Sequence, residues 1–114
     1  MGIQNWSENI ILVNLAAEPD MGEELQTVID QINDRTDQDV VIDFADVDIV
    51  TSSSIAKLLK LRKSLAGNGR RLVFSSVSPK TRSIFVVTGL DNVFEFVDDA
   101  FCALAGLQMV GSAE

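Results

Sequence analysis

The clearest pattern along the chain is a set of three short apolar segments with the composition of buried β-strands. Residues 10–15, 40–44 and 72–76 are rich in β-branched and aromatic side chains, and polar residues bound each of them. The nearly unbroken apolar run in 40–44 predicts a strand that is covered on both faces. Residues 94–97 predict a further short strand, and residues 3–6 predict a partner strand at the edge of the sheet.

Between these strands the apolar residues recur with helical spacing. A helix is predicted over residues 22–34, where four apolar side chains share one face: Leu25, Val28, Ile29 and Ile32. Asp20, with Glu23 three positions later, has the spacing of an N-cap and its acidic partner. A second helix is predicted over residues 53–66 and is stopped by the Gly-Asn-Gly sequence that follows it. Its apolar side is predicted to consist of Ile55, Leu58, Leu59 and Leu65.

Two more helices complete the predicted elements. Ser78 precedes Pro79 in the order of an N-cap and a first helical residue, and the helix that they begin ends at Gly89. Asp98 or Asp99 can cap a final helix, whose apolar positions are Phe101, Leu104, Ala105 and Leu107.

Strands that alternate with helices indicate crossover connections and an α/β fold. We expect a mostly parallel or mixed β-sheet of four or five strands with about four α-helices. The length of 114 residues and the hydrophobic content of 46% fit one domain, residues 1–114, with its core at about residues 9–108. No apolar run approaches the ~20 residues that span a bilayer, and we expect no membrane insertion and no signal peptide.

The residue types that are missing exclude several kinds of chemistry. The chain has no histidine and a single cysteine, Cys102. A zinc site, a Ser-His or Cys-His catalytic pair and an internal disulfide therefore cannot be built. We expect no metal site and no cofactor, and because no convergent set of acid, base and nucleophile is visible, we do not expect an enzyme. Cys102 is predicted to be a buried apolar residue of the final helix, with no redox role.

Charge is segregated along the chain, whose net charge is −8. Arg35 is the single base among residues 1–50, whereas residues 51–90 hold all the other bases and no acid. This pattern indicates either complementary charge within one fold or a basic face for an acidic or phosphorylated partner. The acidic total argues against direct binding of nucleic acid, because affinity for the phosphate backbone comes from neutralising its charge.

The loop after the strand at residues 40–44 ends in four consecutive hydroxyl residues, Thr51 to Ser54. In α/β sheets, functional residues gather in the loops at the carboxyl ends of the strands. One hydroxyl suffices to cap the following helix. A helix start also favours an anion, through its exposed N–H groups and the positive end of its dipole. The residues alone leave both a helix cap and a phosphate site open.

Three passages resemble the STAS domain of bacterial anti-sigma factor antagonists. Residues 40–65 are similar to the family's strand, acidic turn, serine motif and amphipathic helix. Residues 68–96 are similar to its next strand, its Ser-Pro turn and its Thr-Gly-Leu segment, and residues 98–107 to its C-terminal helix. The spacing between Ser-Pro and Thr-Gly-Leu is the more specific feature of the three.

This resemblance implies a single STAS domain that acts as a regulatory binding protein in bacterial transcription control. In the family, an anti-sigma factor with serine kinase activity phosphorylates the first serine of the motif, and a serine phosphatase removes the phosphate. The unphosphorylated form binds the anti-sigma factor and frees the sigma factor. Carried over to this chain, the resemblance implies a cytoplasmic phosphoprotein with its acceptor at Ser52, with Ser53 and Thr51 as the alternatives.

Two positions depart from the family motif. Thr51 stands where the family usually has aspartate, and Ser54 where it usually has glycine. The first change removes a carboxylate beside the acceptor, and the second restricts the backbone. Some STAS proteins of the stressosome type also depart here, and their Ser-Phe-Ile-Ala-Lys stretch is similar to residues 53–57.

The predicted partner surface lies around the start of the second helix and comprises Asp46, Asp48, Ser53, Ser54, Lys57 and Lys60. The alternative for the two lysines is a solvated helix face. Two other functions remain open from the resemblance: a stressosome-like scaffold subunit and an accessory subunit of a transport system. A weak homodimer is a further expectation.

Overall fold

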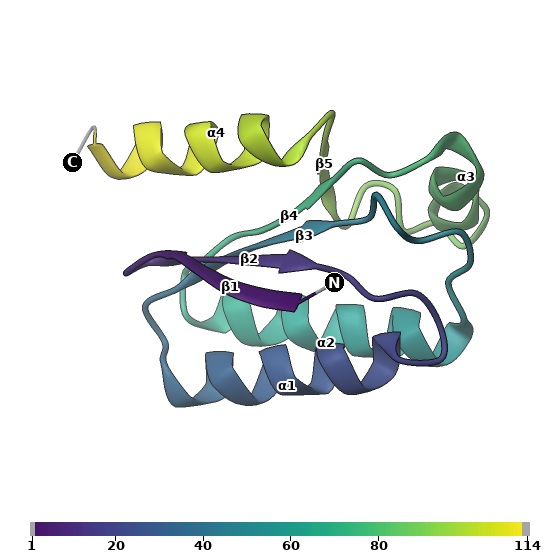
Figure 1. The fold of residues 1–114 in the computed structure, drawn as a ribbon, viewed down its shortest axis with the longest axis horizontal. Helices are drawn as coiled ribbons and strands as arrows, with labels where there is room; N and C mark the ends of the chain where they lie inside the picture. Colours follow the sequence, from purple (N-terminus) through teal and green to yellow (C-terminus); the bar gives the residue numbers. More distant parts are fainter. Residues whose placement is uncertain (1, 113–114) are drawn as a thin grey trace.

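Five strands form one mixed sheet in the order β1-β2-β3-β4-β5 (Figure 1). The computed structural model describes the backbone of residues 2–112 and the side chains of residues 2–107. The strands are β1 (Gly2–Ser7), β2 (Ile10–Asn14), β3 (Asp39–Asp43), β4 (Leu72–Ser75) and β5 (Glu95–Val97). β1 is antiparallel to β2, and the remaining neighbours are parallel. The predicted edge strand and mixed sheet are confirmed.

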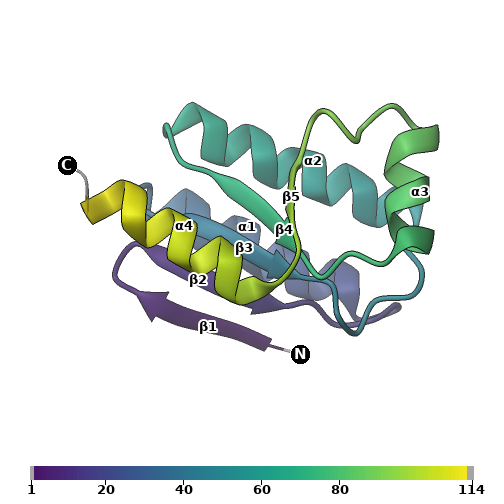
Figure 2. The same ribbon diagram turned by 90° about the horizontal axis from the view of Figure 1, so that it is seen from above.

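Helices cover both faces of this sheet. α1 (Met21–Asp34) and α2 (Ser52–Gly67) lie side by side on one face, and α4 (Ala100–Ser112) crosses β3 and β4 on the other (Figure 2). The short α3 (Pro79–Val87) stands beyond the carboxyl ends of the strands. The predicted α/β class with four helices is confirmed within the described residues.

The core consists of two layers because successive side chains of a strand point to opposite faces. In β2, Ile11 and Val13 pack toward α1 and α2, whereas Ile10 and Leu12 pack against α4. β3 continues this alternation with Val41, which belongs to the α4 layer. The expectation that this strand is covered on both faces is therefore confirmed.

Helix α2 corrects one predicted face. Leu58 and Leu65 are buried as expected, but Leu59 is 37% exposed and Leu61 is fully buried in its place. Residues three and four apart share a helix face, so Leu58, Leu61 and Leu65 form the continuous row toward the core. Leu59 is turned about 100° from that row, since an α-helix has about 3.6 residues per turn.

The two N-caps predicted for α1 and α3 have different outcomes. Ser78 caps α3, its hydroxyl accepting a hydrogen bond from the Thr81 amide at 3.2 Å. Asp20 does not cap α1: its backbone is already helical, at φ −76° and ψ −15°, and its side chain makes no capping hydrogen bond. An N-cap residue needs an extended backbone to direct its side chain at the helix amides.

Cys102 is also placed differently from the prediction. Its side chain is exposed rather than buried, while Ala103, Leu104 and Leu107 form the buried side of α4. Asp99 caps the helix by accepting a hydrogen bond from the Cys102 amide at 2.8 Å. A hydrogen bond between the Cys102 thiol and the Asp99 carboxylate raises the pKa of the thiol, and the negative charge of the carboxylate adds to this effect.

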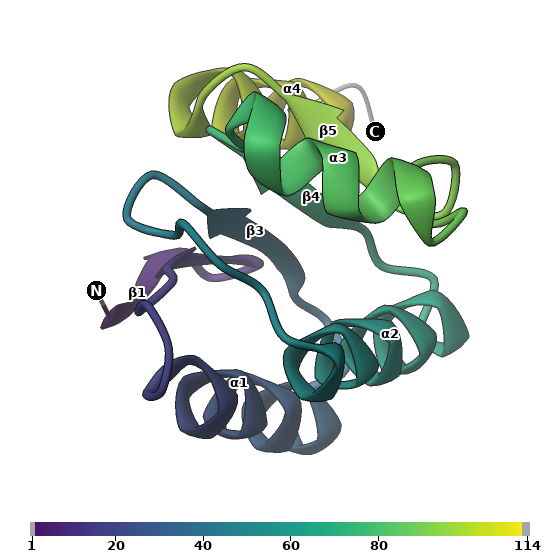
Figure 3. The ribbon, with the colours of Figure 1, turned by 90° about the vertical axis from the view of Figure 1, so that its right-hand side faces the viewer.

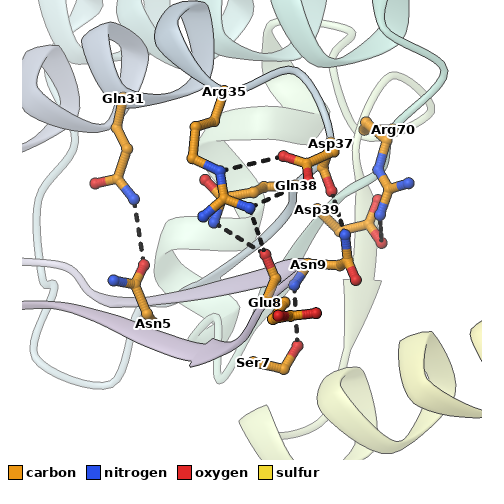
Figure 4. Close-up of polar contacts among 10 residues, drawn as sticks. All are labelled: Asn5, Ser7, Glu8, Asn9, Gln31, Arg35, Asp37, Gln38, Asp39 and Arg70. Atoms are coloured by element: carbon orange, nitrogen blue, oxygen red, sulfur yellow. Dashed lines mark hydrogen bonds and ion pairs between the residues drawn. The ribbon is translucent and has the colours of Figure 1, made fainter.

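A polar cluster holds the amino end of the parallel strands (Figure 4). The Arg35 guanidinium donates to the Glu8 carbonyl at 3.0 Å and pairs with the Asp37 carboxylate at 3.1 Å. Asn9 donates to the Asp37 carbonyl at 2.9 Å, which joins the turn between β1 and β2 to the loop before β3. The single base of the first fifty residues thus serves the fold at the end opposite the hydroxyl run.

Candidate functional site

The hydroxyl run lies where β3 passes into α2, at the end of the sheet that faces the viewer in Figure 3. Residues 44–51 make this connection. Phe44, Val47 and Val50 are buried and anchor the loop to the core, whereas Asp46 and Asp48 between them are exposed. The loop therefore presents its acidic side chains to solvent beside the start of α2.

Thr51 is the N-cap of α2. Its backbone is extended, at φ −89° and ψ 164°, and its Oγ1 accepts a hydrogen bond from the Ser54 amide at 3.2 Å. This geometry satisfies one of the amide groups that a helix start leaves without an intrahelical partner. The helix-cap interpretation of the run is confirmed for Thr51.

Glu18, from the loop between β2 and α1, completes the start of α2. Its Oε2 accepts hydrogen bonds from the Thr51 hydroxyl at 3.0 Å and from the Ser54 hydroxyl at 2.6 Å. We call these three residues the Glu18 cluster. Its carboxylate lies at the positive end of the helix dipole, where negative charge is stabilised. Sequence reasoning missed Glu18, because 33 positions separate it from Thr51.

The four hydroxyls consequently differ in availability. Ser54 is 2% exposed and its hydroxyl is held by Glu18, so its side chain is not part of a surface, contrary to the prediction. Thr51 is exposed as a residue, but its hydroxyl is engaged in the same cluster. Ser52, the first residue of α2, and Ser53 are exposed, and their hydroxyls make no hydrogen bond within the described part of the chain.

The predicted lysines occupy different surroundings. Lys57 is half-buried against α1, where its Nζ donates to the Gln26 Oε1 at 3.0 Å. Lys60 is exposed and, with Lys63, lines a groove between the C-terminal halves of α1 and α2. Seven residues of helix separate Ser53 from Lys60, about 10 Å along the axis. Ser53 thus adjoins Ser52, Asp46 and Asp48 lie on the loop that leads to it, and Lys60 lies two turns along the helix.

The segregated charges are paired in part within the fold. Arg70 pairs with Asp39 at 3.1 Å across β3 and β4. Arg71 pairs with Glu95 through both carboxylate oxygens, and this partner raises the Arg71 pKa. These contacts support the interpretation of complementary charge for the second half of the basic region, and they leave Lys60 on the open surface.

The described residues form neither a metal site nor a membrane-spanning helix. Among residues 2–107, no three acidic or cysteine side chains are grouped so that they could hold a metal ion. Within the described part of the chain, no helix combines the length and the apolar character needed to cross a membrane.

Comparison with known proteins gave one family and a group of solved structures. The family model for the STAS domain matches residues 7–100. No curated protein matches the chain.

Three solved structures show the range of proteins that share this architecture. An anti-sigma-factor antagonist (STAS) domain protein from Planctomyces limnophilus has a TM-score of 0.79 and 19% identity, covering 94% of this chain and 97% of its own. A sulfate transporter family protein from Wolinella succinogenes has a TM-score of 0.75 and 18% identity, covering 91% and 87%. A chain of the stressosome structure has a TM-score of 0.73 and 16% identity, covering 96% of this chain and 98% of its own. At these identities the likeness shows the fold alone.

Proposed function

Because this chain belongs to the STAS domain family, we propose that it is a regulatory binding protein, an anti-sigma factor antagonist that is switched off by phosphorylation. Its partner is an anti-sigma factor with serine kinase activity, and the acceptor is Ser52. A serine phosphatase reverses the modification. The protein itself has no catalytic role in this scheme, binds no nucleic acid directly and acts in the cytoplasm.

The observation that carries the proposal is the position of Ser52. It is the first residue of α2 and it is exposed. The hydrogen bonds at this helix start are made by Thr51 and Ser54 instead. A kinase can therefore reach the Ser52 hydroxyl without breaking a hydrogen bond of the fold. Ser53 shares the exposure and is the alternative acceptor, whereas Thr51 would have to give up its place in the Glu18 cluster.

A phosphate at this position changes the surface that a partner meets. It adds about −1.5 to −2 charges at pH 7 at the end of a loop that already carries the exposed acids Asp46 and Asp48. Burying that charge in an interface is costly unless the partner provides cations for it. A differential affinity of ~3 kcal/mol changes binding about 150-fold, which is enough for an on–off switch.

Affinity capture from the source organism tests this function. Wild type and Ser52→Ala are expected to retain a protein with a serine kinase domain, and Ser52→Asp to lose it. Mass spectrometry of the wild-type chain is expected to find phosphate on Ser52. Ser83→Asp is the matched control, because it adds the same charge to an exposed serine of α3 and is expected to retain the partner. Equal capture by Ser52→Asp and wild type contradicts the charge switch.

A stressosome-like scaffold is the second candidate, supported by the shared architecture with the stressosome chain. It differs from the first in stoichiometry. Co-expression with other STAS proteins of the same organism followed by size-exclusion chromatography is expected to give large mixed assemblies for a scaffold, and at most a weak homodimer for an antagonist. An accessory role in transport, consistent with the transporter-family structure, predicts capture of membrane transport subunits by both Ser52 forms.

A further inference from the structure

The Glu18 cluster joins the proposed switch to a second segment of the chain, residues 15–20 between β2 and α1. This segment is tied to β3 at its first residue and is closed by an internal turn at its last. The Leu15 amide donates to the Asp43 carbonyl at 3.0 Å, and the Asp20 amide closes a turn by donating to the Ala17 carbonyl at 3.1 Å. In the middle, Glu18 is held to α2 by its hydrogen bonds from Thr51 and Ser54.

Glu18 already occupies the electrostatic position that a phosphate on Ser52 would use. Its carboxylate sits at the start of α2, within hydrogen-bond distance of the residue before Ser52 and of the residue two positions after it. Consecutive Cα atoms are about 3.8 Å apart, so a phosphate on Ser52 comes within about 10 Å of the Glu18 carboxylate. This separation is close to the Debye length of about 8 Å at physiological ionic strength, so salt screens part of the repulsion, and less of it where the charges are partly buried.

We propose that Glu18 is the positioning residue through which phosphorylation of Ser52 reaches residues 15–20. The phosphate repels the Glu18 carboxylate, weakens its hold on the Thr51 and Ser54 hydroxyls, and loosens the turn that ends at Asp20. The modified protein then differs from the unmodified one in two segments, the start of α2 and the loop between β2 and α1. This inference rests on the proposed function for the choice of Ser52 as acceptor.

A purely structural role for Glu18 predicts something different. If the carboxylate only holds two hydroxyls, replacing it changes stability by the same amount whatever stands at residue 52. If it responds to charge at residue 52, the effects of the two positions are coupled, as close charged groups are in double-mutant cycles. The coupling between residues 18 and 52 is therefore the quantity to measure.

The experiment compares Ser52→Asp with Ser52→Asn in the wild-type and Glu18→Gln backgrounds, using the purified full chain. Asp and Asn have nearly the same shape, so their difference isolates the charge. Gln keeps an oxygen that can accept hydrogen bonds from both hydroxyls and removes the negative charge. Glu23→Gln is the matched control, since Glu23 is an exposed acid in the first turn of α1 whose side chain makes no hydrogen bond or ion pair with the hydroxyl run.

Two readouts report the coupling. Hydrogen exchange of the Asp20 amide is expected to be about fivefold faster in Ser52→Asp than in Ser52→Asn, which corresponds to ~1 kcal/mol of lost protection. The melting temperature is expected to be lower for Asp than for Asn by a few degrees. In Glu18→Gln neither penalty of Asp remains, because the helix dipole by itself favours a negative charge at this position, and in Glu23→Gln both penalties persist. In the wild-type background, added NaCl is expected to reduce the differences between Ser52→Asp and Ser52→Asn. This gives a second measurement if the double variant folds poorly.

The result that overturns the inference is an Asp-to-Asn difference of the same size with and without the Glu18 charge. Because the purified chain is used alone, this outcome is separate from the fate of the proposed function. If Ser52→Asp loses the partner but shows no coupling to Glu18, the antagonist function is supported and the role of Glu18 is contradicted. If residues 18 and 52 are coupled but Ser52→Asp still binds the partner, the role of Glu18 is supported and the antagonist switch is contradicted.

Discussion

The Ser54 hydroxyl donates a hydrogen bond of 2.6 Å to the carboxylate of Glu18, 36 positions earlier in the chain. Ser54 is 2% exposed, so this contact lies at the margin of the core and not on the open surface. This bond gives one of four adjacent hydroxyls a structural role. Because the Thr51 hydroxyl serves the cap, Ser52 and Ser53 are left as the two exposed residues whose hydroxyls make no hydrogen bond in the described part of the chain. The availability of each hydroxyl is thus set by a residue outside the motif.

Replacing Thr51 tests the cap. Thr51→Ala is expected to lower the free energy of unfolding by ~1 kcal/mol, because it removes an N-cap oxygen and one of the donors to Glu18. Thr51→Ser keeps the hydroxyl and is expected to retain most of the stability. Urea unfolding measures both. Ser53→Ala is the control and is expected to change the stability by less than about 0.5 kcal/mol; a Thr51→Ala variant as stable as this control contradicts the cap.

The buried row of α2 gives a second prediction. Leu61→Ala is expected to cost about 2–5 kcal/mol, since Leu61 is fully buried and its loss leaves a cavity in the core. Leu59→Ala, two residues earlier in the same helix but partly exposed, is expected to cost far less. Thermal unfolding of the two variants side by side checks this assignment. Equal losses of stability in the two variants would show that Leu59 lies on the core face, as the sequence pattern predicted.

The reactivity of Cys102 gives a third prediction. The thiolate is the form that reacts with iodoacetamide, and the Asp99 carboxylate raises the Cys102 pKa by its hydrogen bond and its charge. A raised pKa lowers the thiolate fraction at any pH below it. Asp99→Asn is therefore expected to speed alkylation at pH 8 several-fold while keeping a capping oxygen for α4.

Asp98→Asn is the comparison for that experiment. Asp98 acts on the Cys102 thiol through its charge alone and contributes less to the shift than Asp99 does. Its replacement is expected to speed alkylation only slightly. If both variants react at the rate of the wild type, the hydrogen bond from the thiol to Asp99 does not persist in solution.

Acid titration of Asp37 gives a fourth prediction. The hydrogen bond from Arg35 and the charge of the guanidinium lower the pKa of Asp37 below its ordinary value. A lowered pKa in the folded state contributes stability that is complete above the ordinary pKa and is lost as the pH falls through the folded one. Arg35→Gln is expected to bring the Asp37 pKa back toward the ordinary value, as measured by NMR of the carboxyl carbon.

The stability difference between wild type and Arg35→Gln should accordingly shrink as the pH falls below about 4. A part of it is expected to remain at low pH, because Arg35 also donates to the Glu8 carbonyl, which does not titrate. A difference that is constant across this range would show that Asp37 contributes nothing through its charge.

Local sequence determined the elements and their order. Runs of β-branched residues such as 40–44 can be satisfied only as a covered strand, and the Ser-Pro pair at residues 78–79 fixes a helix start through proline's restricted backbone. The alternation of strands and helices then left few topologies, because crossovers between parallel strands have a preferred hand. The α/β class therefore followed from neighbours along the chain.

What the sequence could not decide depends on contacts between distant segments. Periodicity alone does not fix the rotation of a helix about its axis. In the packed helix α2, Leu61 therefore takes the buried position that the pattern assigned to Leu59. Cys102 is an apolar residue by type, and its exposure follows from the way α4 lies on β3 and β4. In the hydroxyl run, sequence placed four candidates at a helix start. Only the folded chain brought Glu18 to Thr51 and Ser54, because a hydrogen bond is made between atoms about 3 Å apart, whatever their separation in sequence.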